Sequence, residues 1–106
     1  MKYRIQMLRR AHADFASTVA YLYERSPQGA AAWVNAFEKA NARLAGAADS
    51  CSEADENYRF DIDVKQMLFK TRRGRVYRLI FTIVDDEVRI LRVRGPGQAS
   101  VNPDDV

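Results

Sequence analysis

The segment FKTRRGRVYRLIFTI, residues 69–83, decides the fold because a basic, glycine-containing turn is followed by an apolar strand with an arginine near its centre. Successive side chains of a strand point to opposite faces, so every second residue shares a face. One face then carries only apolar or aromatic side chains: Tyr77, Leu79, Phe81 and Ile83. Arg78 lies on the other face, where a charge costs free energy unless something pairs with it. The pattern therefore predicts a strand with one buried face, and a phosphate or an acidic partner segment opposite Arg78.

Strand-like segments flank this one on both sides. Residues 62–71, 75–84 and 88–94 are rich in β-branched and aromatic side chains, and the short RRG and DDE turns between them favour two consecutive hairpins. The same alternation predicts which neighbouring side chains face the core: Met67, Phe69, Leu91 and Val93. Ile90 is predicted to face outward.

Two helices are predicted ahead of these strands, over residues 11–25 and 27–45, because apolar side chains recur there at helical spacing. Ser26 is a favourable N-cap for the second helix, and Pro27 suits its first turn. Residues 3–8 alternate and predict a short first strand, which could add to the edge of the sheet. The short connection between the helices favours an antiparallel pair.

The predicted order is β-α-α-β-β-β. This is an α+β fold in which a two-helix hairpin packs on one face of a small antiparallel sheet. Residues 46–57 have no sustained period and are predicted to form a loop. One domain is expected over residues 1–98, followed by an irregular C-terminal tail over residues 99–106.

Length and composition limit the class of protein. The 106 residues, 47% of them hydrophobic, suffice for one modest core. No apolar run approaches the roughly 20 residues of a membrane span, and the charged N-terminus lacks the apolar region of a signal peptide, so a cytoplasmic protein is expected. Cys51 is the only cysteine, which excludes an intrachain disulfide, and no ligand spacing indicates a metal or another cofactor.

Positive charge is concentrated in the second half of the chain. Residues 64–94 carry nine basic and three acidic side chains, whereas the rest of the chain is slightly acidic. Alternation gathers four cations on the sheet face that the helices leave open: Lys70, Arg78, Arg92 and Arg94. Such a face could bind a polyanion or an acidic protein segment. The alternative is that these are ordinary solvated charges whose aliphatic stems lie over Val76 and Ile80.

Two stretches, YLYERSPQGAAAWVNAFEKANARL at residues 21–44 and RRGRVYRLIFTIVDDEVRILRVRGPGQ at residues 72–98, resemble the RelE/ParE superfamily of toxins from bacterial type II toxin–antitoxin modules. The resemblance covers residues 3–98. It implies two helices against a small antiparallel sheet, in agreement with the fold expected from periodicity. It also implies a toxin held inactive by a cognate antitoxin, which wraps it with an acidic and apolar segment.

The superfamily implies two different activities. RelE-like members are ribosome-dependent mRNA endonucleases that need no metal. Their basic sheet residues hold the message and stabilise charge on the phosphate. ParE-like members instead inhibit DNA gyrase and cleave nothing. By position, Arg78 matches the arginine at the scissile phosphate, and Arg92 or Arg94 matches the basic position at the end of the last strand. Lys65 or Lys70 matches the lysines of the preceding strand. The resemblance thus implies Arg78 and Arg92 as catalytic residues, and all five as RNA-binding or partner-binding residues.

The chain departs from the nuclease pattern at its C-terminal end. RVRGPGQASVNPDDV, residues 92–106, has neither the histidine nor the tyrosine that many members offer for proton transfer. Without a group for proton transfer, RNA cleavage is expected to be slower by a factor of roughly 10² to 10⁴. His12 lies in the first predicted helix, where a surface or capping role is the expectation. Three functions stay open: a nuclease acting on ribosome-bound mRNA, a gyrase inhibitor, and a non-catalytic or degenerate module that only engages an acidic protein partner.

Overall fold

The computed structural model describes residues 3–106. Its helices and strands follow the predicted order: β1 (Arg4–Met7), α1 (Arg9–Arg25), α2 (Pro27–Ala47), β2 (Lys65–Phe69), β3 (Tyr77–Val84) and β4 (Glu87–Arg94). Short 3₁₀ turns lie at Ala48–Ser50, Asn57–Arg59 and Pro103–Asp105. The predicted α+β fold is confirmed. Within the described residues, neither helix combines the length and the apolar character that crossing a membrane requires.

The four strands form one sheet in the order β1-β4-β3-β2. The strands β2, β3 and β4 are antiparallel neighbours, as the two hairpins predict. The first strand, β1, adds in parallel to β4, with Arg4 opposite Glu87, so the complete sheet is mixed. A parallel pair needs a long connection, and the chain through α1, α2 and the hairpin supplies it. The prediction that the first strand joins the edge of the sheet is confirmed.

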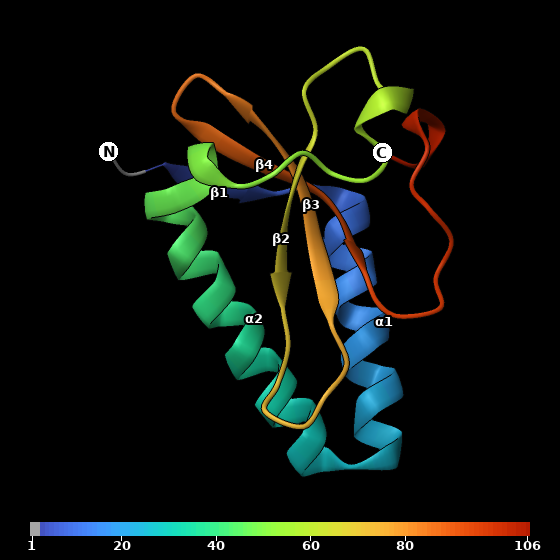
Figure 1. The fold of residues 1–106 in the computed structure, drawn as a ribbon. Coiled ribbons are helices and arrows are strands. Elements are labelled where there is room, and N and C mark those ends of the chain that lie inside the picture. Colours follow the sequence, from blue (N-terminus) through green and yellow to red (C-terminus); the bar gives the residue numbers. More distant parts are fainter. Residues whose placement is uncertain (1–2) are drawn as a thin grey trace.

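The two helices form an antiparallel pair that covers one face of the sheet (Figure 1). Ser26 caps α2 as predicted, because its hydroxyl accepts a hydrogen bond from the backbone N–H of Gly29 at 3.0 Å. Aromatic rings from both helices meet rings from the sheet, with centroids 4.8 to 5.9 Å apart. The side chains predicted to face this core do so at Met67, Phe69, Tyr77, Leu79, Phe81, Ile83 and Val93.

A β-bulge in β4 changes which of its side chains face the helices. Ile80 is opposite Arg92 while Phe81 is opposite Ile90, so Leu91 is the extra residue. Ile90 therefore packs in the core beneath the helices, and Leu91 packs on the other face. The predicted orientations of Ile90 and Leu91 were wrong because regular alternation does not hold across the bulge.

The sheet face opposite the helices is covered, although the sequence predicted an open face. Residues 51–64 and 95–106 fold over it and come together near the C-terminus (Figure 1). They enclose a second apolar cluster whose buried members are Ala54, Val64, Ile80, Leu91 and Val101. The cover forms because Ile80 and Leu91 point outward from the sheet, and burying their apolar surface stabilises the fold. The fold thus has three layers, namely the helix pair, the sheet and the loop-and-tail cover.

The N-cap of α2 gives a direct test of the local structure. Replacing Ser26 by alanine should lower the free energy of unfolding by about 1 kcal/mol, because the Gly29 N–H loses its acceptor. Urea denaturation measures the change. The exposed mid-helix variant Ser17→Ala serves as the control and should change stability by less than about 0.5 kcal/mol. Equal effects of the two substitutions would contradict the capping role.

Candidate functional site

Arg78 has a carboxylate partner inside the molecule. From β3 its two Nη atoms donate hydrogen bonds to the two carboxylate oxygens of Glu56, each at 2.8 Å. Gln66 in β2 accepts a further hydrogen bond from Arg78 Nη1 at 2.9 Å. Glu56 is only 2% exposed. A two-pronged, charge-assisted pair of this kind satisfies the guanidinium without any external phosphate.

Glu56 connects three parts of the chain. It lies in the segment between α2 and β2, it pairs with Arg78 of β3, and its Oε2 accepts the backbone N–H of Val101 in the tail at 2.9 Å. The hydrogen bonds from Arg78 lower the pKa of Glu56 to about 2, against the opposing effect of burial. The carboxylate is therefore charged at neutral pH, and it fastens the loop-and-tail cover to the sheet.

Arg92 in β4 has a second internal carboxylate, Asp14 of α1. Arg92 Nε and Nη2 donate to Asp14 Oδ2 and Oδ1, each at 2.7 Å. The backbone N–H of Val93 also donates to Asp14, at 2.9 Å, and Arg92 Nη1 donates to the carbonyl oxygen of Asp105 at 2.8 Å. The hydrogen bonds with Asp14 raise the pKa of Arg92. The pair holds α1 against β4 immediately after the bulge.

Arg94 lies beside this second pair and is almost fully buried. Its Nη1 is 3.8 Å from Asp14 Oδ2, and its Nε donates to the carbonyl oxygen of Ala99 at 3.0 Å. Burial, together with the nearby charge of Arg92, lowers the pKa of Arg94. Since Arg94 is directly opposite Arg78 in the sheet, the buried carboxylates offset the repulsion within this row of arginines.

The two lysines named by the resemblance lie apart from each other. Lys65 is half-buried at the start of β2, and its Nζ donates to the carbonyl oxygen of Cys51 at 3.1 Å. Lys70 is exposed just beyond the other end of β2. The structure therefore brings Arg78, Arg92 and Arg94 together under the cover and leaves Lys70 outside.

Sequence reasoning missed both carboxylates. Asp14 lies three residues after Ala11, which is fully buried, so both belong to the same side of α1; this spacing could have indicated an inward carboxylate. Glu56 lies in an irregular acidic segment, where no period indicates which side chain turns inward. Neither residue was expected to meet an arginine of the sheet.

Other candidate groups are not assembled into a site. His12 is exposed on α1, in keeping with its expected surface position. Among residues 3–106, no group of three or more histidine, cysteine and acidic side chains is arranged to hold a metal ion.

Most of the exposed cations without a carboxylate partner lie around the β2–β3 hairpin and on the helices beside it. Within residues 3–106, seven exposed cations of this region form no ion pair: Arg25, Lys39, Arg43, Lys70, Arg72, Arg73 and Arg75. Arg9, Arg10 and Arg59 are also exposed without an ion pair in the described part of the chain, at the start of α1 and in the cover. The exposed positive charge of this region therefore lies around the β2–β3 hairpin, and not on the sheet face opposite the helices, where the sequence predicted it.

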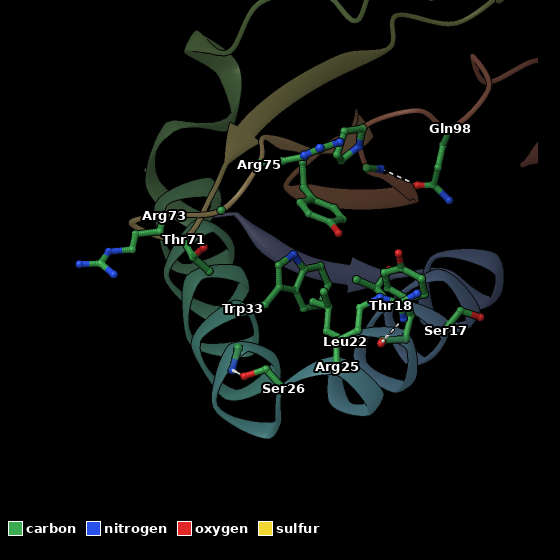
Figure 2. A pocket seen from close by; sticks show the side chains of 16 residues that line it. Ser17, Thr18, Leu22, Arg25, Ser26, Trp33, Thr71, Arg73, Arg75 and Gln98 are labelled. Carbon is green, nitrogen blue, oxygen red and sulfur yellow. Dashed lines mark hydrogen bonds between the residues drawn. The ribbon is translucent and has the colours of Figure 1, made fainter.

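A hollow of about 820 Å³ lies between α1, the start of α2 and the loop that leads into β3. Trp33 forms its floor beside Leu22, whereas Arg73 points away from it (Figure 2). On its rim the guanidinium of Arg25 lies 3.6 Å from the ring centre of Tyr21, which is 54% exposed. An apolar floor with a stacked arginine and tyrosine at the rim is a suitable contact surface for another protein.

The structure is that of a small α+β domain with basic and aromatic surface groups. A family model described as the ParE toxin of the type II toxin–antitoxin system, parDE, matches residues 5–99. The chain therefore belongs to the ParE toxin family, which confirms the resemblance expected from the sequence. The family makes it a toxin of type II toxin–antitoxin systems and implies an antitoxin partner. Comparisons with curated proteins and with solved structures gave no match.

The lowered pKa of Glu56 predicts how stability depends on pH. Because the folded state favours the charged carboxylate, its contribution is complete above about pH 4.5 and is lost as the pH falls toward about 2. Chemical denaturation of the wild type and Glu56→Gln should show a difference in unfolding free energy that shrinks by about 3 kcal/mol over this interval. The exposed variant Glu38→Gln is the control and should follow the wild type. A difference for Glu56→Gln that stays constant with pH would overturn the assignment.

The pair of Asp14 and Arg92 predicts strong coupling in a double-mutant cycle. Asp14→Ala alone should cost about 3 to 5 kcal/mol because it leaves a largely buried guanidinium without its carboxylate. Combining it with Arg92→Met should cost clearly less than the sum of the single changes, with a coupling of about 2 kcal/mol. The more exposed pair of Glu87 and Arg89 is the control and should couple by less than about 1 kcal/mol. Additive effects of the Asp14 and Arg92 changes would be incompatible with the pair described here.

Proposed function

We propose that this toxin inhibits growth by binding DNA gyrase, without cleaving RNA, and that a cognate antitoxin neutralises it. The observation that carries the proposal is the internal neutralisation of Arg78 and Arg92. A ribonuclease of the RelE type needs such cations free to stabilise the charge on the reacting phosphate. Here each guanidinium is already held by a carboxylate of the same chain.

An RNA phosphate would have to displace Glu56 to reach Arg78. Both groups are largely buried beneath the cover, and the carboxylate also accepts the N–H of Val101. Removing one partner from a buried pair costs several kcal/mol, which the incoming phosphate would have to offset. The catalytic roles that the resemblance implies for Arg78 and Arg92 are therefore poorly supported by this geometry, and we propose structural roles for both.

The tyrosines and the histidine that could transfer a proton are also poorly positioned to act on a phosphate at the arginines. Tyr77 is half-buried among the core aromatics, and burial raises the pKa of its hydroxyl. Tyr58 is 77% exposed, and its hydroxyl accepts a hydrogen bond from Arg59 Nε rather than from an arginine of the buried row. His12 lies on the exposed side of α1. A toxin that acts by binding needs none of these groups as an acid or a base.

The hollow beside Tyr21 and Arg25 is the surface we assign to the target. Tyrosine and arginine are enriched among the residues that dominate binding energy at protein interfaces. Tyr21 is more than half exposed, and Arg75, which forms no ion pair within residues 3–106, adds a cation at the same hollow. These groups lie on α1 and on the hairpin loop, so a target could reach them with the cover closed.

Two assays on the wild type separate the possible activities. The purified chain should inhibit supercoiling by gyrase, whereas primer extension on translated messages after induction should show no new cleavage ends. Message cleavage on translating ribosomes would favour the nuclease and overturn the proposal. A chain that leaves growth, gyrase and messages unaffected would instead be a degenerate module that retains only its protein partner.

A matched pair of variants tests the assigned surface. Tyr21→Ala combined with Arg25→Ala should weaken gyrase inhibition at least about tenfold, because a cation–π pair that is desolvated in an interface contributes about 2 kcal/mol or more. Tyr58→Ala removes a more exposed tyrosine from the opposite side of the sheet and should leave inhibition unchanged. Circular dichroism checks that both variants fold. Equal inhibition by the two variants would show that gyrase does not bind at this hollow.

A further inference from the structure

The hollow beside α1 has an apolar floor that is fixed by aromatic packing. The indole of Trp33 is only 2% exposed, and its ring centre lies 5.5 Å from that of Phe15 and 5.3 Å from that of Tyr77. The backbone of Gly95 lies so close to the Tyr77 ring that a Cβ there would come within 2.5 Å of a ring carbon. The volume of about 820 Å³ is in the range of sites that bury a small ligand. The floor is therefore in place before any ligand arrives.

The indole N–H of Trp33 is a donor without an acceptor. Within residues 3–106 it is buried and forms no hydrogen bond. Figure 2 shows the nitrogen of this ring directed toward the part of the hollow below Arg75. Buried polar groups normally have a partner, because a buried donor without one is costly. An acceptor atom brought to this floor would gain a hydrogen bond without displacing a protein partner.

The rim of the hollow is positively charged. The guanidinium of Arg25 lies over the ring of Tyr21, and its Nη1 donates to the carbonyl oxygen of Tyr21 at 3.1 Å, so its Nε and Nη2 remain for a ligand. Arg75 is exposed on the other side of the hollow. Among the described residues, the lining includes no carboxylate. Because no acidic side chain of the lining neutralises these two cations, the hollow attracts an anion.

These features together match a flat aromatic ring that carries a carboxylate. The ring can pack on the indole floor, and the planar carboxylate can accept hydrogen bonds from a guanidinium. An apolar molecule would leave the cations and the indole N–H unpaired, and a small inorganic anion would leave the apolar floor in water. A doubly charged phosphate would lose more hydration beside this floor than a singly charged carboxylate. The chemistry of the lining therefore favours an aromatic acid.

We propose that this hollow binds a small aromatic carboxylate, and that the bound molecule prevents the toxin from engaging gyrase. The ring packs on Trp33, and the carboxylate pairs with the rim guanidinium groups of Arg25 and Arg75. The ligand uses the same rim groups that we assign to the target, so the ligand and gyrase exclude each other. This competition rests on the proposed function, whereas the binding site itself does not.

The first test follows the indole N–H resonance of the ¹⁵N-labelled full chain while 3-phenylpropionate is added. Trp33 is the only tryptophan, so this resonance is unique. It should shift saturably with a dissociation constant of about 5 mM or less, as expected for a ligand of this size. The neutral 3-phenylpropanamide should bind about fivefold more weakly or worse, and acetate should give no saturable shift. An absent shift with the acid, or equal binding of acid and amide, would overturn the proposal.

A pair of variants tests the rim. Arg25→Gln combined with Arg75→Gln should weaken binding of 3-phenylpropionate at least about tenfold, because hydrogen bonds with charged groups are about twice as strong as neutral ones. Arg73→Gln is the matched control, since Arg73 lies on the same loop but points away from the hollow (Figure 2). It should bind as the wild type does. Equal losses in the two proteins would show a general effect of net charge and would contradict the assigned site.

Light scattering tests the other occupant, a second copy of the chain. The ligand-free wild type should be a monomer, because two such rims placed together would repel each other. A dimer that Tyr21→Ala dissociates would show that a second copy fills the hollow, and the proposal would fail.

A supercoiling assay separates the binding site from its regulatory role. At a toxin concentration that inhibits gyrase, saturating 3-phenylpropionate should restore at least half of the supercoiling, and the same concentration of the amide should restore clearly less. Gyrase with 3-phenylpropionate and no toxin is the reference. Full inhibition in the presence of saturating acid would overturn the competition. A wild type that binds the acid but never inhibits gyrase would overturn the proposed function while leaving the binding site supported.

Discussion

The buried ion pair between Glu56 and Arg78 is the interaction on which the outer half of the molecule depends. An arginine near the start of the interior strand β3 needs a carboxylate, and the carboxylate comes from a segment without a long helix or strand of its own. Glu56 then orders that segment and the tail together, because it also accepts the N–H of Val101. Asp14 repeats the arrangement one strand further on, where it ties α1 to Arg92. Each charge would be costly without its partner, so the cover and the row of arginines require each other.

Because the sheet face opposite the helices is covered, the surfaces available for binding lie elsewhere on the toxin. Most of the exposed cations that form no ion pair lie around the β2–β3 hairpin, on α2 and at the end of α1. On one side they border the aromatic hollow that we assign to the target, and on the other they line a groove between β2 and α2. In this arrangement the buried arginines maintain the fold that positions both surfaces.

Much of the fold could be predicted from the sequence, because periodicity reports which side chains share a face. The core row of β3, the helix pair and the Ser26 cap all follow from spacing and from local hydrogen bonding. The bulge at Leu91 could not be predicted, since one extra residue reverses alternation without a sequence signal. The covered face was missed for a related reason: Glu56 and Arg78 are 22 residues apart in the sequence, and no local pattern encodes their contact. Arg78, Arg92 and Arg94 lie together as predicted, but their partners are internal, and Lys70 lies outside this group.

Native-state hydrogen exchange at the backbone N–H of Val101 tests most directly whether this face is closed. That N–H lies in a tail without long elements, so its protection depends on the hydrogen bond to Glu56 and on burial beneath the cover. The account predicts exchange at least about 10³-fold slower than in an unstructured peptide, similar to amides of β3. Exchange at the rate of an unstructured peptide would show that the tail is open, that Arg78 is accessible, and that the account of a sealed cationic face is wrong.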